Sequence, residues 1–352
     1  MSAQLDAIAG QFAGSQAVTA ISPLGNGLIN DTYLVSTDQQ PFVLQRINSA
    51  IFKQPEWIID NLLQIQRHIA NTADIEPQLQ IPALLPTQDQ RYCFRDADQQ
   101  VWRALQLISA SESHEQISQI QQAEQIGFAL GHFHRLCSSI DASQLHDTLP
   151  GFHITPQYYQ QYLMASRLPL TVEQTQTLQS CQAFIEQHRQ QIDILENARQ
   201  QGLLHDRIIH GDPKLNNFLF RQNSHRIISL IDLDTVKPGL IHYDLGDCLR
   251  SCCHIEAGNR FDLDRCETIL SHYLAEAGDF MTAADYDHLY AAIWLIPFEL
   301  GLRFLTDYLQ GDCYFKTHFP GQNLQRAEAQ FALCADIGRQ QTDLQNLITR
   351  LR

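Results

Sequence analysis

The chain has 352 residues, 44% of them hydrophobic, which is enough to bury the cores of two lobes. It carries 39 acidic and 24 basic residues, and the resulting formal net charge of -15 disfavours a nucleic-acid backbone or an anionic membrane surface as a partner. The nine cysteines include no CxxC pair, which indicates free thiols rather than a disulfide framework or a zinc ribbon. Without a signal-like start or an apolar run long enough for a membrane span, we expect a cytoplasmic protein.

The first hundred residues are predicted to form short strands around one helix. Residues 28–36 and 41–47 are β-rich runs separated by a polar turn, which indicates a hairpin. Gly25 and Gly27 precede it, and a loop of this kind can cover phosphates because glycine permits close backbone approach. Asn30 and Thr32 follow as polar candidates for contact with a phosphate or sugar, or as the solvent side of a strand.

A helix is then expected over residues 55–70, and strand character returns over residues 100–108. The chain turns polar after Ile108, so we place the boundary between two lobes there, 1–108 and 109–352. The second lobe is predicted to be mainly helical, with a long polar helix or helix pair over 174–201. Pro297 is expected to kink or interrupt a later apolar helix.

The most informative segment contains His210, Asp212 two residues later, and Asn217 five residues after that, followed by two short strands that end at Asp232. In phosphoryl transfer, metal ions must neutralise the phosphoryl oxygens, and a carboxylate must orient the attacking hydroxyl. Asp212 is therefore the candidate base. Asn217 and Asp232 are candidate Mg²⁺ ligands, because hard divalent cations prefer oxygen. A lone Asp in a turn is more often a cap, but the joint pattern favours catalysis.

Other polar residues near this segment are predicted to support it. His210 and Asp244 are expected to hold the loop by hydrogen bonds, with Asp244 accepting from the loop backbone. Asp247 and Arg250 lie three residues apart and are expected to form a helical ion pair.

The segments HGDPKLNN, IDLDT and HYDLGD resemble the signature of the aminoglycoside phosphotransferase and choline kinase-like superfamily. The resemblance implies an α+β, bilobal, protein-kinase-like fold with a small β-rich N-terminal lobe and a larger, mainly helical C-terminal lobe. It also implies ATP as co-substrate, Asp212 as base, and Mg²⁺ held by Asn217 and Asp232.

A closer likeness covers most of the chain. GNGLINDTYLV, FVLQRIN, IDLDTVKPG and GLRFLTDYLQGDCYF are similar to segments of bacterial N-acetylhexosamine 1-kinases, which phosphorylate the anomeric hydroxyl of N-acetylglucosamine or N-acetylgalactosamine. The likeness implies that Asp234 faces the nucleotide and metal site and that backbone groups near Leu107 bind the adenine edge. It also implies a sugar pocket formed by Arg303, Asp307 and Tyr314. Without the likeness, Glu299, Arg303 and Asp307 would be interpreted as an ion-pair ladder on one helical face.

One position departs from the superfamily pattern. Many relatives place a Lys at the end of the third strand to hold the α- and β-phosphates, whereas this chain has Gln45 there, followed by Arg46. Arg46 is the hypothesis for the missing cation.

Two alternatives stay open at this stage. In the first, the chain is a kinase whose phosphoryl acceptor is another small alcohol, such as an aminoglycoside, choline, homoserine or N-acetylmuramate. In the second, the chain is a pseudokinase-like binding module. Gln45, in place of the usual lysine, supports this alternative, whereas the complete set of Asp212, Asn217 and Asp232 argues against it.

Overall fold

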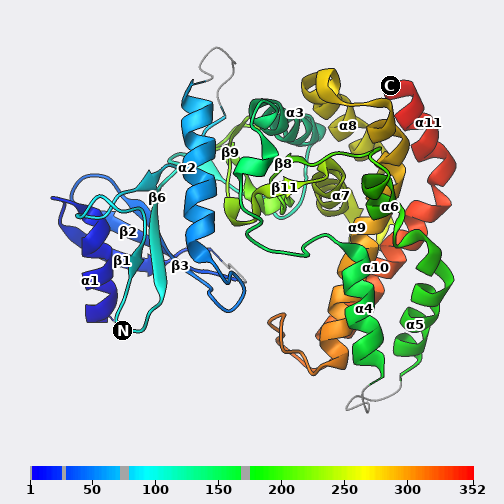
Figure 1. Cartoon of the computed structure of the whole chain (residues 1–352), viewed down its shortest axis with the longest axis horizontal. Helices are drawn as coiled ribbons and strands as arrows, with labels where there is room; N and C mark the ends of the chain where they lie inside the picture. Colours follow the sequence, from blue (N-terminus) through cyan, green and yellow to red (C-terminus); the bar gives the residue numbers. More distant parts are fainter. Residues whose placement is uncertain (1, 26–28, 72–78, 168–174) are drawn as a thin grey trace.

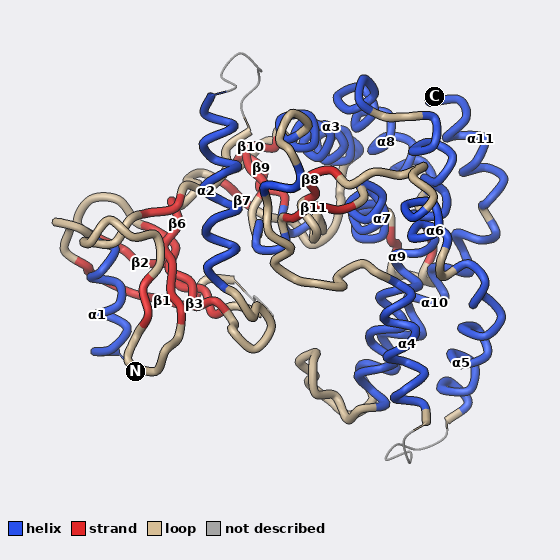
Figure 2. Tube along the Cα trace, in the orientation of Figure 1, coloured by secondary structure: helices blue, strands red, loops and turns tan. Residues whose placement is uncertain are grey.

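An antiparallel sheet forms one end of the molecule, and helices dominate the other (Figures 1 and 2). The computed structural model describes residues 2–25, 29–71, 79–167 and 175–352. The sheet has the strand order β1-β2-β3-β6-β4, with β5 paired to β6. Its strands are β1 (Val18–Pro23), β2 (Asp31–Thr37), β3 (Phe42–Ile47), β4 (Leu84–Leu85), β5 (Phe94–Arg95) and β6 (Val101–Gln106).

Two helices accompany this sheet. The expected helix is confirmed as α2 (Pro55–Asn71), whereas α1 (Ser2–Ala13) and strand β1 were not predicted. Ile8 and Phe12 of α1 pack on one face of the sheet, in a cluster that includes Leu44 and Trp102. The short apolar segment of α1 is stabilised by this contact, because a helix of its length is marginal alone.

The register of three strands decides which side chains face the helical lobe. Gln45 of β3 lies opposite Thr32 of β2 and opposite Arg103 of β6. Opposed residues in antiparallel strands share a face, so these three side chains lie together. Arg46 and Trp102 are the next opposed pair and point to the other face, the one covered by α1.

The chain leaves the sheet after β6. The expected lobe boundary at 108/109 falls just before β7 (Ser111–Glu112), which pairs with β9 in the helical lobe. That lobe contains short antiparallel strands: β8 (Arg207–Ile209), β9 (Phe218–Arg221), β10 (Ile227–Leu230), β11 (Lys237–Gly239), β12 (His254–Ile255) and β13 (Arg260–Phe261). Between β10 and β11 lies a short 3₁₀ turn, η4 (Leu233–Thr235).

Nine described α-helices build the rest of the molecule. They are α3 (Ile120–Cys137), α4 (Thr155–Ser166), α5 (Gln176–His188), α6 (Ile194–Gln200), α7 (Ile241–Cys252), α8 (Leu263–Ala277), α9 (Ala283–Leu309), α10 (Gln322–Arg339) and α11 (Gln341–Leu351). The predicted helix pair in the polar region is confirmed as α5 and α6.

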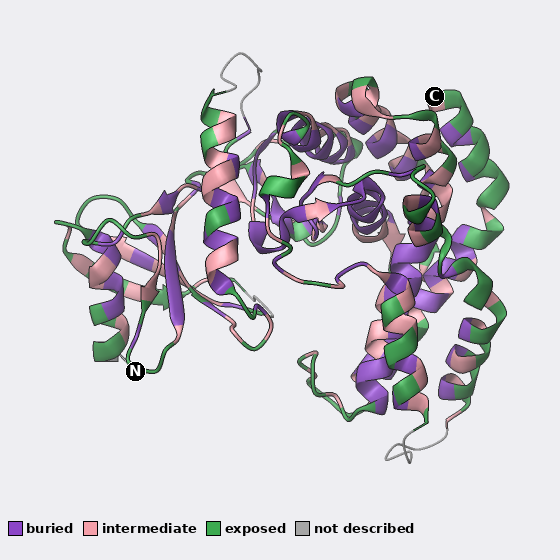
Figure 3. Cartoon of the chain, viewed as in Figure 1, coloured by how far each residue is buried: buried purple, intermediate pink, exposed green. Residues whose placement is uncertain are grey.

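Helix α9 is the central helix of this lobe. The predicted interruption at Pro297 is wrong, because α9 continues through it. Packing against α4, α7 and α10 along its length outweighs a proline cost of about 3 kcal/mol. The sequence analysis found no apolar run long enough to span a membrane, yet by length and composition alone helix α9 could do so. Its apolar window is 78% buried inside the protein, as expected for a core helix (Figure 3).

Close packing of α3 on α8 yields a stability prediction. A Cβ at Gly127 would lie 2.1 Å from the carbonyl oxygen of Ile269. We expect Gly127→Ala to lower the free energy of unfolding by about 1–3 kcal/mol in urea denaturation, because the two helices must separate. Gly10→Ala in α1 is the control, since its Cβ would meet nothing within 4 Å; we expect it to raise stability by about 0.5–1 kcal/mol. Equal stability of both variants would contradict the close approach.

Candidate active site

A buried carboxylate holds the loop that contains Asp212. Asp244, in the first turn of α7, accepts hydrogen bonds from the backbone N–H groups of His210 at 2.7 Å and Gly211 at 2.8 Å. Its Oδ2 also lies 2.8 Å from Nε2 of His134 on α3. The expected contact of Asp244 with the loop backbone is therefore present, and three donors fix the direction in which the loop leaves β8.

His210 joins the two halves of the motif. Its Nε2 donates to the carbonyl oxygen of Ile231 at 3.0 Å, and its Nδ1 accepts from the backbone N–H of Asp212 at 3.3 Å. This pattern requires the neutral ring, and burial lowers the pKa of His210 accordingly. His210 thus supports Asp212 on one side and the residue preceding Asp232 on the other.

Gly211 lets the loop lie against η4. Its φ of +85° is in the left-handed region, and a Cβ there would lie 2.6 Å from the carbonyl oxygen of Thr235. The hydroxyl of Thr235 donates to the carbonyl oxygen of His210 at 2.9 Å. Only glycine fits this position, so the HGD sequence is a packing requirement as well as a chemical one.

Asp212 and Asn217 lie side by side, with Lys214 against them. The Asn217 amide nitrogen donates to the Asp212 carbonyl oxygen at 2.7 Å, which leaves the amide oxygen as a metal donor. Nζ of Lys214 lies 2.6 Å from Oδ2 of Asp212. Burial alone would lower the pKa of Lys214, but Asp212 and Asp232 outweigh it and raise the pKa. Sequence reasoning missed Lys214, although its position two residues after Asp212 was visible.

Asp232 has the environment of a cation ligand. Its backbone is left-handed, with φ of 62°. The surrounding protein and then the nearby Asp234 raise the pKa of Asp232 to about 6, despite Lys214 and Arg103. Excess negative charge of this kind is what a divalent cation neutralises.

The donor set fits Mg²⁺ better than a transition metal. No group of three or more His, Cys, Asp or Glu residues suited to a metal occurs within the described part of the chain. Mg²⁺ needs no such cage, because it is bound by one or two carboxylates together with phosphates and waters. Asn217 and Asp232 stay the predicted protein ligands of such a site.

Asp234 and Asn30 connect the two lobes. Asp234 is 2% exposed, pairs with Arg103 of β6, and accepts from Nδ2 of Asn30 at 2.7 Å. The Asn30 side-chain oxygen accepts from the backbone N–H of Asn48 at 3.0 Å. The carboxylate that the likeness directs toward the nucleotide and metal site is thus already engaged by the N-terminal lobe.

The remaining nucleotide-side predictions have different outcomes. Thr32 accepts from Nε2 of Gln45 at 3.1 Å, on the face that carries Arg103. Gly25 has a positive φ of 69°, Gly27 lies outside the described residues, and Leu107 follows β6 between the two lobes. Their nucleotide contacts stay predictions.

The predicted role of Arg46 needs a correction. It forms an ion pair with Asp31 on the surface, and its guanidinium lies 6.0 Å from the centre of the Trp102 ring. Side chains alternate along β3, so Arg46 points to the face opposite Gln45 and Arg103. The hypothesis that Arg46 replaces the missing lysine is not supported by this placement.

Helix α9 contacts the loop of Asp212 through His153. Nδ1 of His153 lies 3.1 Å from Oε1 of Glu299, and its Nε2 lies 2.7 Å from the carbonyl oxygen of Gly211. Both neighbours are acceptors, so both ring nitrogens donate and the ring is protonated. Burial lowers the pKa of His153, but Glu299, Asp247 and the carbonyl oxygen of Gly211 together outweigh burial, so the pKa is raised. Sequence reasoning missed these two contacts because Gly211 and Glu299 lie 58 and 146 positions away from His153 in the chain.

Arg303 and Asp307, which were predicted to line the sugar pocket, do not form an ion-pair ladder with Glu299. Arg303 packs among aromatic rings, 5.1 Å from the centres of Phe152 and Tyr158 and 5.5 Å from that of Phe315. Asp307 instead accepts from the backbone N–H groups of Tyr314 at 2.7 Å and Phe315 at 2.9 Å.

Asp307 therefore organises the segment after α9, and Tyr314 is left 49% exposed. Phe152 precedes His153, so Arg303 is placed next to the residue that contacts the catalytic loop.

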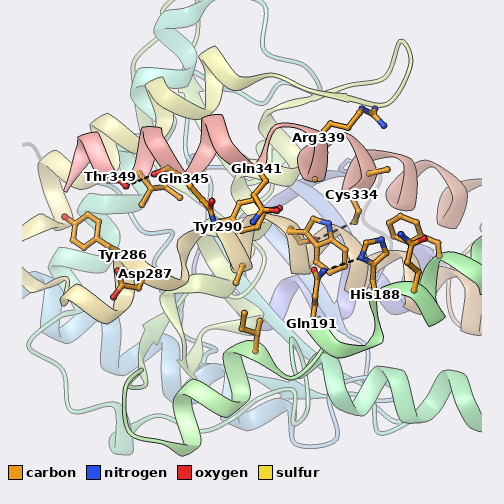
Figure 4. Close-up of a pocket in the computed structure, with 18 of the residues that line it drawn as sticks. His188, Gln191, Tyr286, Asp287, Tyr290, Cys334, Arg339, Gln341, Gln345 and Thr349 are labelled. Carbon is orange, nitrogen blue, oxygen red and sulfur yellow. Dashed lines mark hydrogen bonds between the residues drawn. The ribbon is translucent and has the colours of Figure 1, made fainter.

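The molecule also has a cavity of about 940 Å³ away from these residues (Figure 4). It is lined by α5, α9, α10 and α11, with His188, Tyr290 and Gln341 among its labelled side chains. None of the predicted site residues lines it. Cavity size therefore does not identify the reactive site in this chain; the geometry of the loop does.

Comparison with known proteins agrees with this geometry. A family model described as "Phosphotransferase enzyme family" matches residues 20–280. The chain is similar in structure to an aminoglycoside phosphotransferase from Alicyclobacillus acidocaldarius, at a TM-score of 0.66 and 18% identity over 96% of both chains.

Two further solved structures have the same fold. One is a microcompartment-associated aminopropanol kinase, with a TM-score of 0.64 and 18% identity over 96% of this chain and 98% of that chain. The other is an amicoumacin kinase in complex with AMP-PNP, Ca²⁺ and its substrate, with a TM-score of 0.59 and 12% identity over 91% and 90% of the chains. The expected bilobal, protein-kinase-like α+β fold is confirmed.

The His153 contact yields a prediction about pH. Its raised pKa means that its stabilising effect is fully present below the unfolded-state pKa of about 6.5 and is lost as pH rises through the folded-state pKa. Glu299, Asp247 and the Tyr243 ring face it. We expect His153→Gln to lower the free energy of unfolding by about 3 kcal/mol at pH 6, because Glu299 loses its buried partner.

The difference between His153→Gln and the wild type should shrink as pH rises, measured by urea denaturation across pH 6–9. His225→Gln, which changes an exposed histidine, serves as the control and should leave stability unchanged. A deficit that does not vary with pH would contradict a protonated His153.

Proposed function

Because the chain belongs to the phosphotransferase enzyme family, we propose that it transfers the γ-phosphoryl group of ATP to a hydroxyl group of a small molecule. The observation that carries the proposal is the packing of Asp212 against Asn217 and Lys214, on a loop joined to the Asp232 segment by His210. A base, two metal-ligand oxygens and a cation thus lie on two adjoining segments. Phosphoryl transfer needs this combination, because positioning and charge neutralisation supply most of its rate.

Each residue has a separate part in the reaction. Asp212 orients the acceptor hydroxyl and takes its proton as the oxygen attacks phosphorus. Lys214 stabilises negative charge on the transferring group, since its raised pKa keeps it protonated. Asn217 and Asp232 would hold Mg²⁺, which neutralises phosphate oxygens when bound. Asp244 and His210 act through the loop and position Asp212.

We propose a neutral sugar, an N-acetylhexosamine, as the acceptor, phosphorylated at its anomeric hydroxyl. The similarity to N-acetylhexosamine 1-kinases in the sequence supports it, and so does the charge of Arg303. A guanidinium among Phe152, Tyr158 and Phe315 repels a cationic acceptor, whereas it can donate to a carbonyl or hydroxyl oxygen. Aromatic rings also give a sugar an apolar surface to pack on.

A cationic alcohol is the second candidate. Two of the similar structures are named for aminoglycoside and aminopropanol substrates, and this chain carries 39 acidic residues. Such an acceptor requires carboxylates close to Asp212 on the acceptor side. Glu299, which contacts the loop of Asp212 through His153, is already bound to His153 and Thr155.

The acceptor is tested by a substrate panel. We expect Mg²⁺-dependent ATP consumption with N-acetylglucosamine or N-acetylgalactosamine, and a sugar 1-phosphate in the phosphorus NMR spectrum. N-Acetylmuramate, choline, homoserine and kanamycin should give rates at least about tenfold lower, the discrimination that one or two hydrogen bonds provide. Turnover restricted to a cationic alcohol would keep the kinase and remove the sugar.

The role of Asp212 is tested by Asp212→Asn. Loss of the base should lower kcat by about 10²–10⁴-fold while the variant stays folded and still binds nucleotide. Asp206→Asn is the matched control, because Asp206 pairs with Arg199 outside the loop and its change should leave kcat unaltered. Equal ATP turnover in wild type and Asp212→Asn would point to a binding module instead.

A further inference from the structure

A buried guanidinium faces the metal-binding segment from the N-terminal lobe. Arg103 of β6 is 1% exposed and lies opposite Gln45 on the face of the sheet that meets η4. Its Nε and Nη2 donate to Oε1 of Gln45 at 3.0 and 2.7 Å, and Nη2 also pairs with Asp234. Gln45 is thus the neutral side chain that holds Arg103 in place.

One nitrogen of this guanidinium has no partner. Nη1 of Arg103 is buried, yet none of the described residues accepts a hydrogen bond from it. An unsatisfied buried donor costs about 1–3 kcal/mol, and more when it is charged. Gln45 and Asp234 hold the other nitrogens, so the free N–H groups are pre-organised for an anion that is absent from the isolated chain.

The neighbours of Arg103 include residues that the sequence analysis predicts to lie at the nucleotide. Asp234 lies two residues after Asp232 and also accepts from Asn30. Asn30 continues from the glycine-containing segment, and Thr32 shares the face of Gln45. A group bound at Nη1 would therefore lie near Asn30, Thr32 and the η4 turn that follows Asp232.

Other cations near this face are already committed. Arg46 points to the opposite face and pairs with Asp31. Lys214 belongs to the loop of Asp212 and not to the N-terminal sheet, and Lys237 is bound to Asp147 and to carbonyl oxygens. Among the described residues of the N-terminal sheet, Arg103 is the cation directed at the metal segment.

We propose that Arg103 binds a phosphate oxygen of the nucleotide through Nη1 and supplies the cation that the third strand lacks. Asp234 then orients Arg103 and links phosphate binding to the segment that carries the metal ligand Asp232. Nη1 is enclosed in the isolated chain, so phosphate binding requires the side chains around it to move. The proposal rests on the proposed function, since it assumes that the chain binds a magnesium nucleotide.

The test compares ligands with and without phosphates. Arg103→Gln alone leaves Asp234 buried and unpaired, so the double variant Arg103→Gln/Asp234→Asn, which removes both charges, is used beside it. Binding of Mg·ADP and of adenosine is measured by calorimetry on the full chain. We expect both variants to bind Mg·ADP about ten- to a hundredfold more weakly, with adenosine affinity changed less than about twofold. Arg46→Gln is the matched control and should bind both ligands as the wild type does.

The possible outcomes separate the role of Arg103 from the proposed kinase function. Wild-type-like Mg·ADP binding by the double variant, or equal weakening of Mg·ADP and adenosine, overturns the role of Arg103 and leaves the kinase intact. Absence of nucleotide binding by the wild type overturns both. A rise in the KM for ATP in Arg103→Lys that exceeds any fall in kcat agrees with phosphate binding, because lysine keeps the charge and loses the planar fork.

Discussion

The candidate site depends on one buried carboxylate, that of Asp244. It accepts the two backbone N–H groups that begin the catalytic loop, and His134 holds it from α3. A carboxylate without exposure is tolerated only when its hydrogen-bonding capacity is filled, so the loop and the helices stabilise one another. The positions of Asp212 and Asn217 follow from this anchor, because both lie a few residues beyond it.

Charge balance is the second constraint. Among the described residues, Asp232 lies near two other carboxylates, those of Asp234 and Asp212, and near two cations, Lys214 and Arg103. Burial first, and then the charges of Asp234 and Asp212, raise the pKa of Asp232 despite these two cations. An arrangement of this kind favours the binding of a divalent cation together with an anionic ligand, since the charge of each neutralises the charge of the other. The same balance explains why the N-terminal and C-terminal lobes meet through a buried ion pair.

Local pattern predicted much of this arrangement. The hairpin of β2 and β3, helix α2 and the spacing from His210 to Asp232 follow from alternation, helical period and motif, which are properties of neighbouring residues. Helix α1 was missed because its stability comes from the sheet that it covers. The continuity of α9 through Pro297 depends on three packed helices, none of which is local to that proline.

Residues that act across the fold were harder to predict. The sequence analysis assigned no role to Arg103, because its direction follows from strand register, which places it opposite Gln45. Arg46 was favoured because it is adjacent to Gln45 in sequence, yet adjacent residues of a strand point to opposite faces. His153 contacts Glu299 and Gly211, and no spacing in the sequence indicates either contact.

The central claim is that the His210 to Asp232 region binds a magnesium nucleotide beside an acceptor hydroxyl. A crystal structure with Mg²⁺, a non-hydrolysable ATP analogue and N-acetylglucosamine tests it most directly. The account predicts the metal on Asn217 and Asp232, and a sugar hydroxyl within hydrogen-bond reach of Asp212 and in line with the γ-phosphate. Nucleotide bound elsewhere, or a sugar hydroxyl outside that reach, would contradict it.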